Sequence, residues 1–131
     1  MVNDINLIQG GTSKLADIVR EPFMVKLPHK GGFNPGLVRW RGRLLMAWRQ
    51  GWHPGRLWIG ELDAGFRLSW AQEIDFGQAW EPGPFDGMED PRLIADGDRL
   101  LLAFTQVHWD QSQERRTVRM ALGELNEAMV V

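Results

Sequence analysis

Hydrophobic positions in this chain gather in short runs that are separated by turn residues. Segments 44–48 and 100–104 are apolar at every position, and each follows a Gly-containing turn, at residues 41–42 and 96–98. Short apolar runs next to such turns are typical of strands in hairpins. Because a strand that is apolar at every position must be covered on both faces, we expect both segments to be buried inner strands.

The two hairpins belong to an internal repeat. Residues 35–48 align with residues 91–104 at a constant offset of 56, and six of the 14 positions are identical. The similarity resumes where residues 60–63 (GELD) match residues 123–126 (GELN). Each repeat therefore contains a strand, a turn, a second strand, a variable loop and a third strand. The identical pairs are Pro35/Pro91, Leu37/Leu93, Arg43/Arg99, Leu44/Leu100, Leu45/Leu101 and Ala47/Ala103.

The repeat predicts an all-β fold. After the third strand of the first repeat, residues 66–74 supply a fourth strand, and a Pro- and Gly-rich crossing leads into the second repeat. Units of this kind are typical of β-propeller blades, so we expect one domain of about two four-stranded antiparallel blades. Its parts are an N-terminal strand segment (1–33), a blade unit (34–76), a crossing (77–88) and a second blade unit (89–131).

The second blade unit ends after its third strand, at residues 118–125, and the strand-like segment 23–27 stands where a fourth strand would lie. Residues 119–129 alone have good helix propensity, but we interpret them as strand because they repeat the end of the first unit. Two blades cannot bury their own faces. We therefore expect a homo-oligomeric ring, with a trimer (six blades) or pentamer (ten) favoured over a dimer (four). The alternative is a piece of a longer gene product.

Composition limits the partners and the chemistry. The 131 residues include no Cys, which excludes disulfides and thiolate zinc sites, and the formal net charge of −2 argues against nucleic acid. We interpret the local basic run Arg39, Arg41 and Arg43 as a solvated hairpin. No apolar stretch is long enough for a signal peptide or a membrane span, so we expect no membrane association, with the cytoplasm as the default location.

Three motifs resemble glycoside hydrolase family 130: residues 33–36 (FNPG), 48–49 (WR) and 87–92 (GMEDPR). That family contains mannoside phosphorylases and β-mannosidases on a five-bladed β-propeller. The resemblance implies that Asp90 is the proton donor to the glycosidic oxygen. It also implies that Glu89 and Arg92 shape the sugar subsite, and that Asn34 and Arg49 contact substrate or phosphate.

Glycoside cleavage usually needs two carboxyls on either side of the scissile bond. Glu89 and Asp90 are adjacent, so in an extended strand they point to opposite faces and only one lines the cavity; we choose Asp90. Phosphorolysis needs one protein acid, since phosphate is the nucleophile and Arg49 and Arg92 are suited to hold it. In the alternative interpretation, Glu89, Asp90 and Arg92 form a structural ion-pair and turn motif at the blade entrance.

Aromatic and histidine side chains recur in the corresponding loops of the two repeats, as Trp52-His53 and His108-Trp109. Trp rings can stack on sugars and imidazoles can hydrogen-bond to them, and Trp80 in the crossing is also placed for ligand contact. The alternative is that these Trp rings plug the blade edges. No third ligand accompanies the two histidines at a recognisable spacing, so we expect neither a metal nor another cofactor.

These features favour a carbohydrate-recognising β-propeller protein related to glycoside hydrolases, and they leave its catalytic competence open. One alternative is an active mannoside phosphorylase or glycosidase that uses Asp90 as general acid. Another is a structural ring without a small-molecule ligand. The sequence has no phosphate-loop motif and no nucleophile elbow, so nucleotide hydrolysis and serine hydrolase chemistry have no support.

Overall fold

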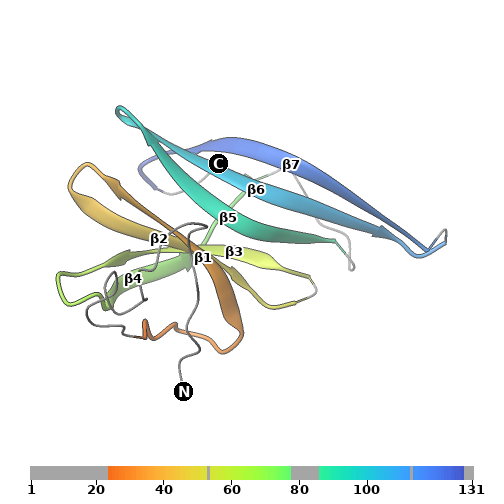
Figure 1. Ribbon diagram of the computed structural model, residues 1–131, viewed down its shortest axis with the longest axis horizontal. Helices are drawn as coiled ribbons and strands as arrows, with labels where there is room; N and C mark the ends of the chain where they lie inside the picture. Colours follow the sequence, from red (N-terminus) through yellow and green to blue (C-terminus); the bar gives the residue numbers. More distant parts are fainter. Residues whose placement is uncertain (1–23, 53, 78–85, 113, 129–131) are drawn as a thin grey trace, which may run out of the picture.

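The chain forms two antiparallel sheets, one from each unit of the internal repeat (Figure 1). The computed structural model describes residues 24–52, 54–77, 86–112 and 114–128. The first sheet has the order β1-β2-β3-β4 and the second the order β5-β6-β7. The strands are β1 (Gly32–Trp40), β2 (Arg43–Gln50), β3 (Arg56–Leu62), β4 (Leu68–Glu73), β5 (Gly87–Asp96), β6 (Arg99–Asp110) and β7 (Arg115–Leu125).

The expected all-β fold is confirmed, and the first unit has its four antiparallel strands. The second unit has three strands among the described residues. Residues 24–27 are not a strand in this structure, and Phe23 lies outside the described residues. The segment with high helix propensity is strand as far as Leu125, because it pairs with β6 along its length. Tertiary pairing therefore overrides local propensity there.

The sequence repeat is also a repeat of strand register. Ala47 pairs with Ile59 in the first sheet, and Ala103 pairs with Leu122 in the second. The offset is therefore 56 for the first two strands of each unit and 63 for the third. The seven additional residues extend β6 and β7 beyond the equivalents of β2 and β3, as the pairs from Val107↔Val118 to Asp110↔Arg115 show, and the pairing of the shared part is unchanged.

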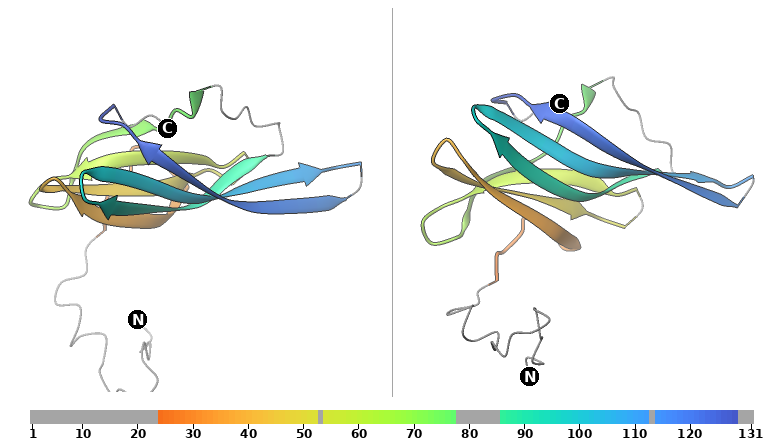
Figure 2. Two further views of the ribbon diagram at one scale, coloured as in Figure 1. Left: turned by 90° about the horizontal axis from the view of Figure 1, so that it is seen from above. Right: turned by 45° about the horizontal axis from the view of Figure 1, so that its top comes forward.

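The two sheets pack against each other through one face each. The face of the first sheet that meets the second carries Leu45, Ala47, Leu57 and Ile59, all 0% exposed. We call it the front of that sheet, and we call the opposing face of the second sheet its back. Figure 2 shows the second sheet lying over the first, with one end of β6 and β7 extending beyond it. The back of the second sheet contributes Leu93, Leu100, Leu102 and Phe104 to the core.

The prediction of two-sided burial holds for β2 and is wrong for β6. Residues Leu45 to Arg49 of β2 are all buried. In β6, Leu100, Leu102 and Phe104 are buried, whereas Leu101 and Ala103 between them are only half-buried. The physical reason is that no layer of described residues covers the part of the front that carries Leu101 and Ala103, whereas Val107, farther along the same face, is 2% exposed.

Close contact between β1 and β5 joins the sheets at one edge. A Cβ atom on Gly36 would lie 2.6 Å from the carbonyl oxygen of Pro91, so no larger residue fits there without a backbone shift. At the hairpins, the indole N–H of Trp40 donates to the carbonyl of Asp98 at 3.1 Å. The first strands of the two units are therefore held side by side.

A polar cluster on the first sheet makes stability depend on pH. Glu61 accepts hydrogen bonds from the Arg43 guanidinium (2.9 and 3.0 Å) and from the Trp70 indole (3.0 Å). The Arg43 bonds, followed by the Trp70 bond, lower the pKa of Glu61 below its ordinary value of 4.5. The stabilisation is therefore complete above that ordinary pKa and is lost as the pH falls through the lowered one.

We expect Glu61→Gln to remove this part of the pH dependence. Its size is at most about 1 kcal/mol, because the pair is partly exposed and solvent screens it. Urea unfolding at pH 7 and at acidic pH measures the difference in unfolding free energy. An equal acid-induced loss in the wild type and the variant would contradict this assignment.

Candidate functional site

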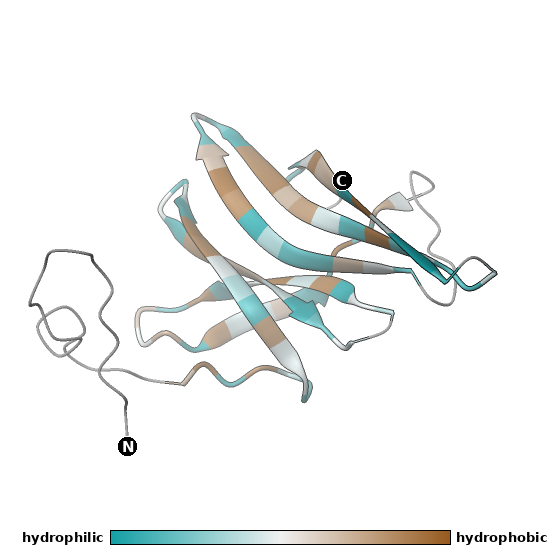
Figure 3. Cartoon of the chain, turned by 45° about the vertical axis from the view of Figure 1, so that its right-hand side comes forward, coloured by the Kyte–Doolittle hydropathy of each residue, from teal (hydrophilic) through white to brown (hydrophobic). Residues whose placement is uncertain are grey.

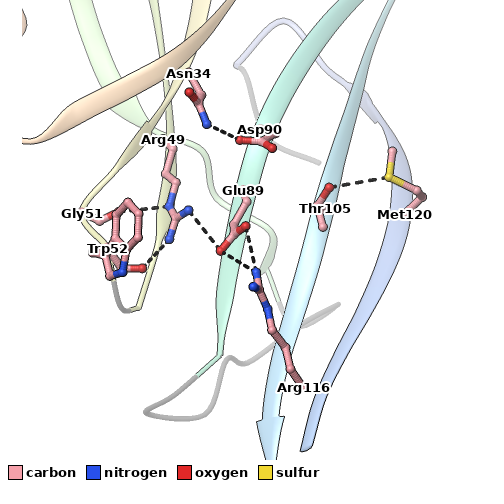
Figure 4. A network of polar contacts seen from close by, with 9 residues as sticks. All are labelled: Asn34, Arg49, Gly51, Trp52, Glu89, Asp90, Thr105, Arg116 and Met120. Carbon is pink, nitrogen blue, oxygen red and sulfur yellow. Dashed lines mark hydrogen bonds and ion pairs between the residues drawn. The ribbon is translucent and has the colours of Figure 1, made fainter.

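Two equivalent β-bulges bring Asn34 and Asp90 together. The strand register shifts between Phe33 and Gly36 in β1 and between Glu89 and Arg92 in β5, positions that are 56 residues apart. Asn34 and Asp90 have left-handed φ angles of 52° and 53°. Asn and Asp tolerate this conformation better than other residues with a Cβ. Asn34 Nδ2 donates to Asp90 Oδ1 at 2.5 Å (Figure 4).

Arg49, on β2, forms the buried part of the site. Its side chain is only 4% exposed, and Nη1 lies 3.0 Å from Oε1 of Glu89. Its Nε donates to the carbonyl of Gly51 at 3.1 Å, and its Nη2 donates to the carbonyl of Trp52. All three guanidinium nitrogens therefore have partners within the chain. This geometry favours a positioning role, in which Arg49 fixes the start of the β2–β3 loop and holds it to β5.

Arg116 is a member of this network that the sequence analysis missed. Its Nη2 lies 3.2 Å from Oε2 of Glu89, so the Glu89 carboxylate, 14% exposed, meets two guanidinium groups. Arg116 precedes the repeated part of β7, so the repeat gives no signal for it. Only the pairing of Trp109 with Arg116 in the β6–β7 hairpin places it there.

The Trp52 ring lies beside the buried guanidinium. It stacks on Phe33 with a centroid distance of 5.5 Å, and the Arg49 guanidinium lies 5.2 Å from the Trp52 ring centroid and 5.0 Å from that of Phe33. Trp52 is nevertheless 69% exposed. The structure thus presents an exposed aromatic ring that packs against Arg49 and against Phe33, the residue before Asn34 (Figure 4).

The bulge in β5 changes the expected alternation of Glu89 and Asp90 across the strand. Glu89 and Asp90 do not form a simple extended pair, because Asp90 has a positive φ. Their partners are nevertheless separate: Glu89 contacts two arginines, whereas Asp90 contacts Asn34. Asp90 is exposed, and its Oδ2 has no hydrogen-bond partner among the described residues. Of the two carboxyls, Asp90 is therefore the one accessible to a ligand.

Arg92 and His108, which the sequence also predicted for the site, make no hydrogen bond or ion pair with the described residues of this network. Arg92 is exposed, its Nη1 donates to the carbonyl of Pro91 at 2.9 Å, and its pairing with Ala103 puts it on the front of the second sheet. His108, near the end of β6, has Nδ1 2.5 Å from Oδ1 of Asp86, and Trp109 follows it at 39% exposure. The predicted residues His53 and Trp80 lie outside the described residues.

Within the described ranges, no group of three or more His, Asp or Glu side chains has an arrangement suited to a metal ion. In the same part of the chain, no helix has the length and apolar character needed to cross a membrane. Comparisons with protein-family models, curated proteins and solved structures found no match to this chain.

Proposed function

We propose that this chain is a carbohydrate-recognising module of two β-propeller blades, related to the glycoside hydrolases of family 130. The observation that carries the proposal is the pairing of exposed Asp90 with Asn34 at equivalent bulges, with the exposed Trp52 ring stacked on Phe33, the residue before Asn34. The bulges lie on β1 and β5, the first strands of the two units, which lie side by side. In a propeller, the first strands of the blades line the central axis, where ligands commonly bind.

The chemistry of these groups suits a sugar. A carboxylate and an amide offer acceptors and a donor to neighbouring hydroxyl groups, and an exposed indole face can stack on the C–H face of a pyranose. The Arg49–Glu89–Arg116 network behind them is held by the ion pairs already described. A fixed support of this kind reduces the ordering cost of binding.

A second candidate, an active mannoside phosphorylase, is favoured by the separation of the two carboxyl groups. Glu89 is bound by two arginines, so it is not presented to substrate as a nucleophile or base. In phosphorolysis, a phosphate oxygen bonds to the anomeric carbon while the glycosidic C–O bond breaks. Protonated Asp90 would give its proton to the leaving oxygen. One accessible carboxyl is sufficient for this reaction.

Binding and turnover of manno-oligosaccharides test these functions. We expect saturable binding by calorimetry, and we expect Trp52→Ala and Asp90→Asn each to raise Kd at least about tenfold, which corresponds to about 1.4 kcal/mol. Matched controls are Met24→Ala, a 95% exposed apolar side chain, and Asp98→Asn, whose side chain is 91% exposed. Both controls should bind as the wild type does.

The same assay with and without inorganic phosphate separates the candidates. Binding without turnover supports the recognition module. Phosphate-dependent turnover that Asp90→Asn abolishes supports the phosphorylase, whereas turnover in water alone supports a hydrolase. If the protein neither binds nor cleaves these sugars, both functions are wrong, and the ion-pair network is structural.

A further inference from the structure

The front of the second sheet, the face turned away from the first sheet, carries an exposed apolar patch beside the exposed side chain of Arg92. The large side chains of the patch are Ile94, Val118, Met120 and Leu122, which are 44%, 54%, 76% and 66% exposed. Half-buried Leu101 and Ala103 lie between them, because Leu101 pairs with Ile94 and Ala103 with Leu122. Figure 3 shows hydrophobic residues along β5 and β6. Contiguous apolar surface of this kind marks an interaction site.

The internal repeat shows that this face corresponds to the front of the first sheet. By the offset of 63, Met120 and Leu122 are equivalent to Leu57 and Ile59, which are 0% exposed on the front of the first sheet. By the offset of 56, Leu101 and Ala103 are equivalent to Leu45 and Ala47 in the same way. At these apolar positions the front of the second sheet repeats the face that the first sheet packs against the second, and it differs at Arg92, which stands at the position of Gly36.

The back of the first sheet, the face turned away from the second sheet, corresponds in the same way to the back of the second sheet. Leu37, 52% exposed, is equivalent to Leu93, 7% exposed, which packs against the first sheet within the chain. Met46, Trp48 and Leu62 are likewise equivalent to the core residues Leu102, Phe104 and Leu125. With Leu37 and Phe66, these three residues line an apolar groove on the back of the first sheet.

The segment before β1 occupies part of this back face. Val25 and Leu27 pack against the cluster that contains Trp48, and they line the groove without filling it. A similar segment crosses the back of the second sheet, where Phe76 lies 5.1 Å from Phe104 and remains inside the interface between the sheets. A segment at this place is therefore compatible with a sheet packed over it.

We propose that the front of the second sheet of one copy packs against the back of the first sheet of the next copy, in the orientation that joins the two sheets within the chain. Because Arg92 stands where Gly36 makes its close contact, the two sheets lie farther apart at the β1–β5 edge of this interface than they do within the chain. The interface is head-to-tail, so repeating it closes a ring or extends a filament. It rests on the propeller arrangement in the proposed function and does not depend on sugar binding.

Two charge substitutions test the head-to-tail arrangement. Leu122→Glu alters only the front of the second sheet, and Leu37→Glu alters only the back of the first sheet. We expect the wild type to sediment as an assembly of three or more copies. Each variant should sediment as a monomer near the chain mass of 15.0 kDa. An equimolar mixture of the two should form a 1:1 dimer, because one intact front meets one intact back.

Circular dichroism verifies that each variant is folded, and Met120→Glu replaces Leu122→Glu if that variant is not. Arg115→Glu is the matched control, since it adds a Glu to the same strand outside the front face, and it should assemble as the wild type does. A monomeric wild type, or a dimer formed by Leu37→Glu alone, would overturn the proposal, the latter by showing front-to-front packing. Because sedimentation needs no sugar, this result is independent of the outcome of the binding assay.

Discussion

Replacing Arg49 with Met is expected to lower the free energy of unfolding by about 3 to 5 kcal/mol, the usual cost of removing one partner from a buried ion pair. The Arg49 side chain is 4% exposed and that of its partner, Glu89, is 14% exposed. The substitution leaves the Glu89 carboxylate with one guanidinium instead of two. It also removes the donors to the carbonyls of Gly51 and Trp52. Urea unfolding measures the change.

Two companion variants show whether burial is the cause. Arg116→Met removes the other guanidinium from Glu89, but Arg116 is 49% exposed, so its loss should cost at most about 1 kcal/mol. In the double variant Arg49→Met with Glu89→Leu, both charges of the buried pair are absent. Much of the stability should return, because no buried carboxylate is left without its partner. Equal losses of unfolding free energy for Arg49→Met and Arg116→Met would contradict this explanation, because the exposed ion pair would then stabilise the fold as much as the buried one.

Much of the fold could be predicted from the sequence, because the repeat carries both the strand order and the register. The match of residues 60–63 with 123–126 placed the third strand of the second unit correctly, against its helix propensity. The burial of β6 could not be predicted in the same way. An apolar segment indicates that a strand can be covered on both faces, whereas the described residues leave Leu101 and Ala103 of β6 half-buried on one face.

The site was predicted in part. Asn34, Arg49, Glu89 and Asp90 come together, with Trp52 beside them. Asn34 and Asp90 are equivalent by the offset of 56, one position before the aligned segment, and they contact each other because β1 and β5 lie side by side. The positioning role of Arg49 could not be predicted from the repeat. It depends on the backbone carbonyls of Gly51 and Trp52, which the β2–β3 loop brings within hydrogen-bonding distance.

Equivalent residues of the repeat should respond differently to truncation. Ile59→Ala should lower the unfolding free energy by about 2 to 5 kcal/mol, because Ile59 is 0% exposed and its loss opens a cavity between the sheets. Leu122→Ala, at the equivalent position of the second sheet, should change it by less than about 0.5 kcal/mol in an isolated chain, because this side chain is 66% exposed. The same position in the repeat thus supports folding in one sheet and is free for association in the other.

The measurement requires a background in which copies do not associate, so both truncations are made in the Leu37→Glu variant and compared by urea unfolding. In the otherwise wild-type chain, Leu122→Ala should instead weaken association, observed as a shift of the sedimenting species toward monomer on dilution. A large loss of stability for Leu122→Ala in the Leu37→Glu background would mean that another part of the same chain covers the front of the second sheet. The repeat would then describe packing that is completed within one chain, with no face left for a second copy.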